Sequence, residues 1–300
     1  MKRRKKFIIT PVLSVLLIII SCIVFYNDSN GSKPVFRTDD YNDKLVVHFF
    51  DVGQGDSAFI EFPNDECMLI DAGTSDCDDI IIDTVESYGY SKIDYIIATH
   101  PHADHIGAMS SVIDYFDIGE IYMPNISSNS KTFENLLQTI SDNGLQVNTA
   151  CADKIINTES ELEIEFFSPQ PNMTYDDLNN YSAVLKITYG DDSFLFTGDA
   201  ENIAEADMMD LYSSELDCDV LKVGHHGSDS SSSEEFLNAV TPQYAVISCG
   251  NHNSYGHPHK ETLNRLESMG TKVYRTDKQG TITFISDGQN SIEILNGENE

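Results

Sequence analysis

The sequence predicts an α/β protein built from two similar halves, and three observations support this prediction. Short apolar runs typical of strands alternate with stretches of helical periodicity. A β-hairpin pattern that ends in an aspartate occurs twice, as "SAFIEFPNDECMLIDAG" and as "SAVLKITYGDDSFLFTGDA". After each aspartate comes a helical stretch and then a strand that runs into histidines, so that Asp71 precedes His100 by 29 residues and Asp199 precedes His225 by 26.

The first element is an apolar segment close to the N-terminus. The basic stretch "MKRRKK" is followed by twenty uncharged residues, which at about 1.5 Å per residue are long enough to cross the roughly 30 Å of a bilayer core. Basic residues before this segment predict a cytoplasmic N-terminus, with the rest of the chain outside the cell. We therefore expect residues 1–26 to form a basic N-terminus and one transmembrane helix, with lipoprotein processing at Cys22 as the alternative.

The remaining chain is expected to form a linker, one domain and a tail. Residues 27–43 are polar and rich in turn formers, which is typical of a linker. The domain is expected to span 44–288, followed by a C-terminal tail over 289–300. In its first half we expect strands at 45–50, 57–62, 67–71 and 94–99, and helices at 78–89, 105–116 and 131–143.

The composition is strongly acidic. The formal net charge is −31, from 18 Lys and Arg against 49 Asp and Glu, so the surface should repel long polyanions. Only a small basic patch is expected, formed by Lys222, Lys272, Arg275 and Lys278. The six cysteines include no C-x-x-C pair, which argues against a disulfide scaffold and against a zinc ribbon.

The most informative stretch is "THPHADHI", because it holds three of the nine histidines. The proline disfavours a helical conformation at His100, so His100 and His102 are expected to be extended and to point the same way, as two ligands of one metal ion do. Asp104 and His105 follow where the chain turns into a helix, and they face a neighbouring position. The spacing therefore predicts two adjacent metal sites.

Several motifs carry a family resemblance. Together with "TGD" and "GHHGS", the histidine stretch resembles the motifs of the metallo-β-lactamase superfamily. The stretches "DVGQGDS", "NNYSAVLKI", "LKVGHHGS" and "NSYGHP" are similar to the extracellular hydrolase domain of ComEC-type DNA-uptake proteins, over about residues 44 to 286. The resemblance implies an αββα sandwich of two similar halves, in which separate strand ends build one site at one edge.

The resemblance also implies a set of metal ligands. These are His100, His102, Asp104, His105, Asp199 and one histidine of the pair His225 and His226, of which His226 is favoured. Asp199 would bridge two divalent ions, since a carboxylate has two oxygens; Zn²⁺ is expected first and Mn²⁺ second. Superfamily members usually have a further ligand histidine before the bridging aspartate, but no histidine occurs from 106 to 224, so an oxygen ligand or water is expected to complete one site.

Other residues are candidates for catalysis, for the rim of the site or for support of a ligand. The catalytic candidates are Asp104, His225 and His257, the substrate or rim candidates are Gln54, Asn180 and Ser182, and Asp71 is expected to hydrogen-bond a ligand histidine. The alternatives are a turn or cap role for Asp71, a tight hairpin turn around Gln54 and a helix-start position for His257.

The expected activity follows from two adjacent ions. Water held between them loses a proton near neutral pH, and the resulting hydroxide would attack phosphorus or carbonyl carbon. The resemblance favours a metal-dependent phosphodiesterase or nuclease, acting outside the cell on single-stranded nucleic acid or, in better agreement with the charge, on a small anionic molecule. The alternatives are hydrolysis of amide or lactone bonds, as in β-lactamases, and a metal-binding envelope module without catalysis.

Overall fold

The computed structural model describes residues 41, 43–289 and 291–296, which all belong to one compact unit that begins at residue 37. The expected transmembrane helix and nearly all of the expected linker lie outside these described residues. Within them, no helix combines the length and the apolar character needed to cross a membrane.

The first of two sheets has eight strands, in the order β15-β14-β1-β2-β3-β4-β5-β6. Neighbours from β15 to β3 are antiparallel, and neighbours from β3 to β6 are parallel. The strands are β1 (Leu45–Phe49), β2 (Ala58–Glu61), β3 (Cys67–Ile70), β4 (Lys92–Ile97), β5 (Asp117–Met123), β6 (Val147–Thr149), β14 (Ile282–Ser286) and β15 (Ile292–Asn296).

The second sheet has seven strands, in the order β13-β12-β11-β10-β9-β8-β7. Here the neighbours from β7 to β10 are antiparallel, and those from β10 to β13 are parallel. The strands are β7 (Ile155–Ile156), β8 (Glu163–Ser168), β9 (Val184–Tyr189), β10 (Asp192–Phe196), β11 (Val220–Lys222), β12 (Tyr244–Ile247) and β13 (Lys272–Arg275).

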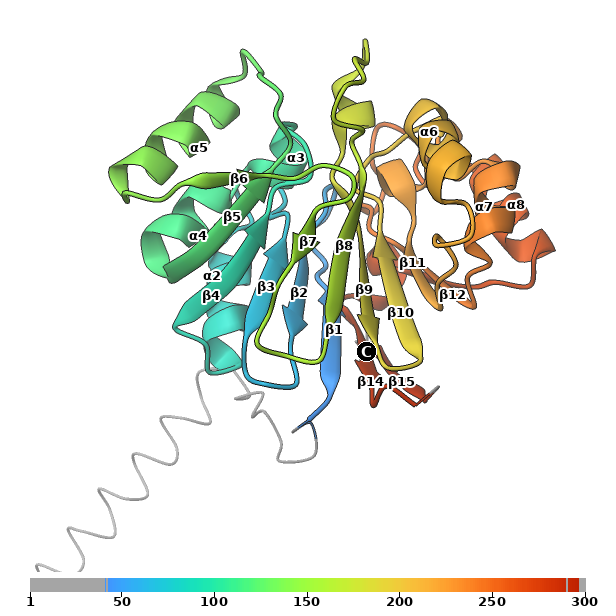
Figure 1. Ribbon diagram of the computed structural model, residues 1–300, viewed down its shortest axis with the longest axis horizontal. Helices are drawn as coiled ribbons and strands as arrows, with labels where there is room; N and C mark the ends of the chain where they lie inside the picture. Colours follow the sequence, from blue (N-terminus) through green and yellow to red (C-terminus); the bar gives the residue numbers. More distant parts are fainter. Residues whose placement is uncertain (1–40, 42, 290, 297–300) are drawn as a thin grey trace, which may run out of the picture. The chain divides into compact units, whose positions relative to one another are not determined.

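Helices cover the outer face of each sheet. Figure 1 shows the sheets packed against each other in the middle, with α2, α4 and α5 on the flank of the first and α6, α7 and α8 on the flank of the second. The predicted α/β fold with two sheets is therefore confirmed. The α-helices are α2 (Asp78–Ser87), α3 (Ala103–Ile106), α4 (Met109–Tyr115), α5 (Lys131–Asp142), α6 (Asn202–Tyr212), α7 (Glu234–Val240), α8 (Lys260–Ser268) and α9 (Thr276–Gln279).

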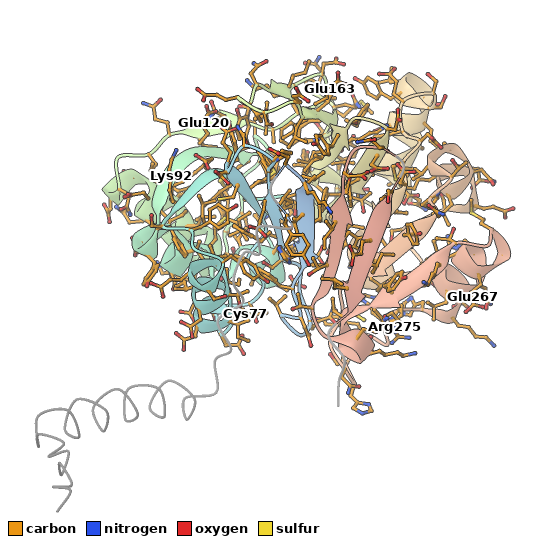
Figure 2. All side chains as sticks on the ribbon, turned by 90° about the horizontal axis from the view of Figure 1, so that it is seen from below. Cys77, Lys92, Glu120, Glu163, Glu267 and Arg275 are labelled. Atoms are coloured by element: carbon orange, nitrogen blue, oxygen red, sulfur yellow. The ribbon has the colours of Figure 1, made fainter. Side chains whose placement is uncertain are left out.

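Three apolar cores hold the four layers together. The core between the sheets is rich in phenylalanine, and each helix layer adds a core against its own sheet. Figure 2 shows Lys92 and Glu267 on opposite flanks, with side chains filling the space between the sheets. Representative buried residues are Phe49, Phe166 and Phe284 between the sheets, Ile81, Val112 and Leu136 under the first helix layer, and Met208, Leu237 and Leu266 under the second.

The two hairpins of the internal repeat occupy equivalent places in the two sheets. β2 and β3 form the first antiparallel hairpin, and β9 and β10 form the second. Each hairpin is followed by a helix, α2 or α6, and by a parallel strand beside it, β4 or β11. Since the carboxyl ends of parallel strands meet at one edge of a sheet, Asp71, His100, Asp199 and His225 come to the same edge of the molecule.

Two expected boundaries are wrong. The helix expected at 105–116 is two short helices, α3 and α4, separated at Gly107 and Ala108. A Cβ on Gly107 would lie 2.5 Å from the backbone nitrogen of Ser75, so the chain approaches the 74–75 backbone closely here. The tail expected at 289–300 contains β15, which pairs with β14 and packs Ile292 and Ile294 against the core between the sheets.

Candidate metal centre

His100 and His102 lie side by side directly after β4, as the spacing predicts. His102 is extended (φ −80°, ψ 148°) and stands at the N-cap of α3. The Nε2 atom of His100 lies 3.0 Å from Nδ1 of His102. Two imidazole nitrogens at this separation face one position, which a metal ion could occupy.

α3 brings the next two candidates to the same edge. The helix begins at Ala103, two residues before the expected start at 105, so both Asp104 and His105 belong to its first turn. His105 is fully buried, and its Nδ1 atom lies 2.7 Å from Oδ2 of Asp71. Asp71 is fixed in turn by the backbone N–H and the hydroxyl of Thr99, at 2.8 and 2.6 Å. His105 therefore turns Nε2 away from Asp71 and towards the centre of the site.

Asp199 is the carboxylate at the centre of the site. Its Oδ1 atom lies 3.2 Å from Nε2 of His105, and its Oδ2 atom lies 3.7 Å from Nε2 of both His100 and His226. The backbone N–H of Asp199 donates to Oγ of Ser182 at 3.0 Å, which positions the turn after β10. Asp199 thus lies within reach of three histidines, with Oδ1 beside His105 and Oδ2 beside both His100 and His226, a position from which a carboxylate could join two ions.

The His225–His226 pair stands in a strained turn, η3 (Gly224–Gly227), directly after β11. Both histidines have left-handed backbone conformations, with φ of 48° and 54°. Two successive non-glycine residues of this kind cost free energy and are typical of functional sites. The turn sends the two rings in different directions.

The ring of His226 is buried at the centre of the site. Its Nδ1 atom donates to the carbonyl of Ser248 at 3.0 Å, which leaves Nε2 3.4 Å from Oδ2 of Asp104. The ring of His225 is 24% exposed, and its Nδ1 atom lies 3.2 Å from Oε1 of Glu201. The geometry favours His226 as the ligand, with His225 facing the substrate side.

These side chains fall into two groups that could each hold one metal ion. His100, His102 and Asp199 form one group, and His105, His226, Asp199 and Asp56 form the other, with ligand atoms within 4.8 Å of one another. The buried atoms His105 Nε2, His226 Nε2 and Asp199 Oδ1 make no hydrogen bond to any described residue. Polar atoms are rarely buried in this state, so the donor set fits divalent cations.

The charges in the site depend on one another. Burial alone would raise the pKa of Asp199, but His105 and His226 hold it well below its usual value. Burial alone would lower the pKa of His226, yet Asp199 and Asp56 raise it to about 10. For His105, Asp199 and Asp71 likewise overcome burial and raise the pKa well above its usual value. Without metal, protons on these histidines balance the carboxylates, so metal binding must displace protons.

Asp56, in "DVGQGDS", is a site residue that sequence reasoning missed. It is buried, lies 3.2 Å from Nδ1 of His226 and pairs with Nζ of Lys222 at 2.5 Å. Lys222 was expected in an exposed basic patch and is instead 5% exposed, because β11 directs it towards Asp56. The sequence signal for Asp56 is its place in the glycine-rich motif "DVGQGDS"; in the structure a Cβ on Gly55 would lie 2.4 Å from the carbonyl of Asp104, so the glycine allows this turn to approach α3.

An open cavity of about 320 Å³ lies over the two groups. Gln54 and His257 line it, and Oε1 of Gln54 accepts from the N–H of Gly250 at 3.1 Å. Burial and the neighbouring His225 lower the pKa of His257 to about 4. The other residues that line the cavity are His102, Ala103, Asp104, Asn179, Asp199, His225, His226 and Tyr255.

The expected rim roles of Asn180 and Ser182 are wrong. Both are almost fully buried, because the turn η2 (Leu178–Tyr181) points them inward. Ser182 supports Asp199, and Oδ1 of Asn180 accepts from the N–H of Ala204 at 3.2 Å, at the start of α6. Asn179 lines the cavity instead, and its buried Oδ1 atom makes no hydrogen bond within the described part of the chain.

The comparison with protein families agrees with this geometry. Residues 50–252 match the model of the metallo-beta-lactamase superfamily. The chain belongs to this superfamily. No histidine occurs from 106 to 224, and the η2 turn before Asp199 contributes Asn179 to the lining of the cavity.

Two curated relatives resemble this superfamily member. ComE operon protein 3 from Bacillus subtilis (strain 168) is 31% identical over 256 residues, which cover 79% of this chain and 32% of the relative. Competence protein ComA from Neisseria gonorrhoeae is 31% identical over 242 residues, which cover 80% of this chain and 32% of the relative. The chain therefore spans about a third of the length of these curated relatives.

One solved structure illustrates the shared fold. CmlA, a diiron β-hydroxylase from Streptomyces venezuelae, superposes with a TM-score of 0.52 at 12% identity, covering 85% of this chain and 54% of CmlA. At this identity the likeness concerns the metallo-β-lactamase-like fold alone.

Proposed function

We propose that this chain is a metal-dependent phosphodiester hydrolase held at the outer face of the cell membrane by its N-terminal segment. The observation that carries the proposal is the position of Asp199. Its two oxygens lie 3.2 to 3.7 Å from His100, His105 and His226 at the base of an open cavity. Two-metal hydrolases require such a carboxylate between adjacent ligand groups.

Two divalent ions, with Zn²⁺ expected before Mn²⁺, fit the donor set. His100, His102 and Asp199 would hold one ion, and Asn179, which lines the cavity and has an Oδ1 atom without a hydrogen bond to any described residue, is a candidate for a further ligand. His105, His226 and Asp199 would hold the other, joined by Asp104, which lies 3.4 Å from Nε2 of His226, because Lys222 engages the remaining member of that group, Asp56. When bound, the ions supply positive charge for an anionic substrate and lower the pKa of water.

The chain itself supplies orientation and hydrogen bonds. His225 is held by Glu201, so its Nε2 atom faces the cavity 3.9 Å from Oδ2 of Asp199, where it can contact a phosphate oxygen. His257 is neutral at pH 7, because its pKa is lowered to about 4, and it can donate an N–H to the leaving oxygen without carrying charge. The pKa of Asp104 is lowered to about 2, mainly by His226 against burial, which suits a ligand better than a proton acceptor.

A phosphodiester substrate is favoured over an acyl substrate by the relatives. One relative, competence protein ComA, is named for competence, and its similarity covers 80% of this chain. The net charge of −31 and the engagement of Lys222 by Asp56 leave few cations for long nucleic acid. We therefore propose short single-stranded nucleic acid or a small anionic phosphodiester as the substrate.

The test is cleavage by the full-length protein. Single-stranded oligonucleotides and a small phosphodiester are incubated with protein loaded with Zn²⁺ or Mn²⁺, beside the Asp199→Ala variant. The proposal predicts cleavage that falls by at least about a thousandfold in the variant, because both ions lose their shared ligand. Hydrolysis of an amide or lactone by the loaded protein, without cleavage of any phosphodiester, would refute it.

The membrane location is proposed from the sequence alone. The charge-free segment after "MKRRKK" supports one transmembrane helix with the domain outside, and the alternative is lipidation at Cys22. Protease added to intact cells should then degrade the domain and leave a short membrane-bound fragment that retains residues 1–26. Full protection of the domain would refute the orientation, and a lipid-modified Cys22 found by mass spectrometry would favour the alternative.

A further inference from the structure

The cavity has an aromatic wall that the proposed chemistry does not use. Tyr255 lines the same cavity as Asp199 and His225, yet 65% of its surface is exposed. We infer that the ring of Tyr255 is a stacking platform for a nucleobase of the substrate, beside the phosphodiester held at the metal centre. This inference rests on the proposed function, and it narrows the substrate class to phosphodiesters that carry a base.

The platform continues a series of rings that begins at the metal centre. The rings of His226 and His257 have centroids 6.2 Å apart, at 30° to each other. Those of His257 and Tyr255 have centroids 5.6 Å apart, at 24°. The His257–Tyr255 pair is stacked and the His226–His257 pair is tilted, so the rings step outward from a ligand histidine to the mouth of the cavity. A planar base placed against Tyr255 would extend the series by one member.

The loop that carries Tyr255 is braced by side-chain hydrogen bonds. The amide nitrogen of Asn253 donates to the carbonyls of Gly250 and His257, at 2.9 and 2.6 Å, and its Oδ1 atom accepts from the N–H of His257 at 3.0 Å. Nδ1 of His259 accepts from the N–H of Asp229, so Nε2 carries the proton and donates to the carbonyl of Tyr255 at 3.2 Å. An exposed ring on a braced loop loses little freedom on binding.

The charge of the protein makes such a platform useful. Most proteins that bind nucleic acid obtain affinity from Lys and Arg that neutralise phosphates, but here the net charge is −31. Base stacking does not depend on charge and occurs with every base, since each has an aromatic face. The inference therefore predicts that binding requires bases on the ligand. The affinity should change only weakly with salt concentration.

The chain contains no tryptophan, which allows a direct test. Tyr255→Trp in the full-length protein places the single tryptophan on the platform, where it can be excited apart from the tyrosines, and Tyr115→Trp places it on the flank, at a tyrosine that is 53% exposed. Each Zn²⁺-loaded variant is titrated with a four-nucleotide phosphorothioate DNA that resists cleavage, and with an abasic chain of equal length. We expect saturable quenching only for Tyr255→Trp with the base-carrying DNA, with a dissociation constant that changes little with salt.

The outcomes separate the two proposals. Quenching that is absent, or equal with the abasic chain, overturns the stacking platform whether or not the parent protein cleaves DNA. Quenching without cleavage of any phosphodiester by the parent keeps the platform and refutes the proposed function. Where cleavage occurs, Tyr255→Ala should lower kcat/KM for base-carrying substrates by about 5- to 100-fold, the range of base–aromatic stacking, whereas Tyr255→Phe should retain it.

Discussion

At the scale of single residues, the site depends on side chains behind the ligands as much as on the ligands. Asp71 fixes His105, the Ser248 carbonyl fixes His226, and Glu201 fixes His225. Each contact uses Nδ1, so each Nε2 atom turns towards the cavity or its centre. Supporting contacts of this kind set the tautomer and direction of a ligand ring.

Replacement of Asp71 tests this arrangement. In Asp71→Asn, one oxygen that accepts from Thr99 or His105 becomes an amide nitrogen. This change disfavours the tautomer of His105 that carries its proton on Nδ1 and leaves Nε2 free to bind metal. We expect zinc affinity to fall about 10- to 100-fold, measured by competition with a chelator. The control Asp76→Asn changes an exposed carboxylate and should bind zinc like the parent. Equal affinity in the two variants would exclude the role of Asp71.

The buried ion pair of Asp56 and Lys222 makes a second prediction. Lys222→Met leaves a buried carboxylate without its partner, which should lower the free energy of unfolding by about 3–5 kcal/mol in urea titrations. The double variant Asp56→Asn with Lys222→Met removes both charges, so most of this loss should be recovered. If the double variant loses as much free energy of unfolding as the two single variants together, the two side chains are not energetically coupled.

At the scale of elements, strand ends and tight turns bring the ligands together. Apolar runs and turn residues predicted β1 to β4, and the repeated hairpin predicted the equivalent positions of Asp71 and Asp199. The direction of Asn180 and Ser182 could not be predicted, because a single 3₁₀ turn decides which side chains face inward. Asp56 was missed because an aspartate in a glycine-rich turn is usually a turn former.

The turn at Gly55 makes a prediction at this scale. A Cβ at Gly55 would lie 2.4 Å from the carbonyl of Asp104, so Gly55→Ala should displace α3. The matched control is Gly119→Ala in β5, where a Cβ would lie 2.3 Å from the carbonyl of Asp94, away from the site. Both variants should lose about 1–3 kcal/mol of stability, but only Gly55→Ala should also lose zinc affinity. Equal zinc affinities in the two folded variants would contradict this account.

At the scale of the whole molecule, two sheets and two helix layers converge on one buried group of charges. The fold class was predictable because a pattern repeated in both halves requires two similar packing units. The last strand, β15, could not be predicted, because "IEILN" is short and follows a polar turn. The metal centre links the two sheets, since its ligands follow strands of both, so metal content and stability should be coupled.

The pH dependence of stability follows from the raised pKa values in the metal-free protein. The pKa of His226 is raised to about 10, so protonated His226 contributes stability that is fully present below its unfolded pKa of about 6.5 and is lost as the pH rises through 10. The pKa of His105 is also raised, so protonated His105 likewise contributes stability that is lost as the pH rises. Urea titrations in chelator should therefore show a falling free energy of unfolding from pH 7 to pH 10. Zinc-loaded protein should show a smaller fall, and equal slopes would contradict the assignment.

The central claim is that Asp199 joins two metal ions, and metal stoichiometry tests it most directly. The full-length protein, the Asp199→Ala variant and the control Asp76→Asn are loaded with Zn²⁺, dialysed and analysed by mass spectrometry for metal per chain. The account predicts two ions per chain for the parent and the control, and fewer than one for Asp199→Ala. Two ions retained in Asp199→Ala, or none in the parent, would contradict it.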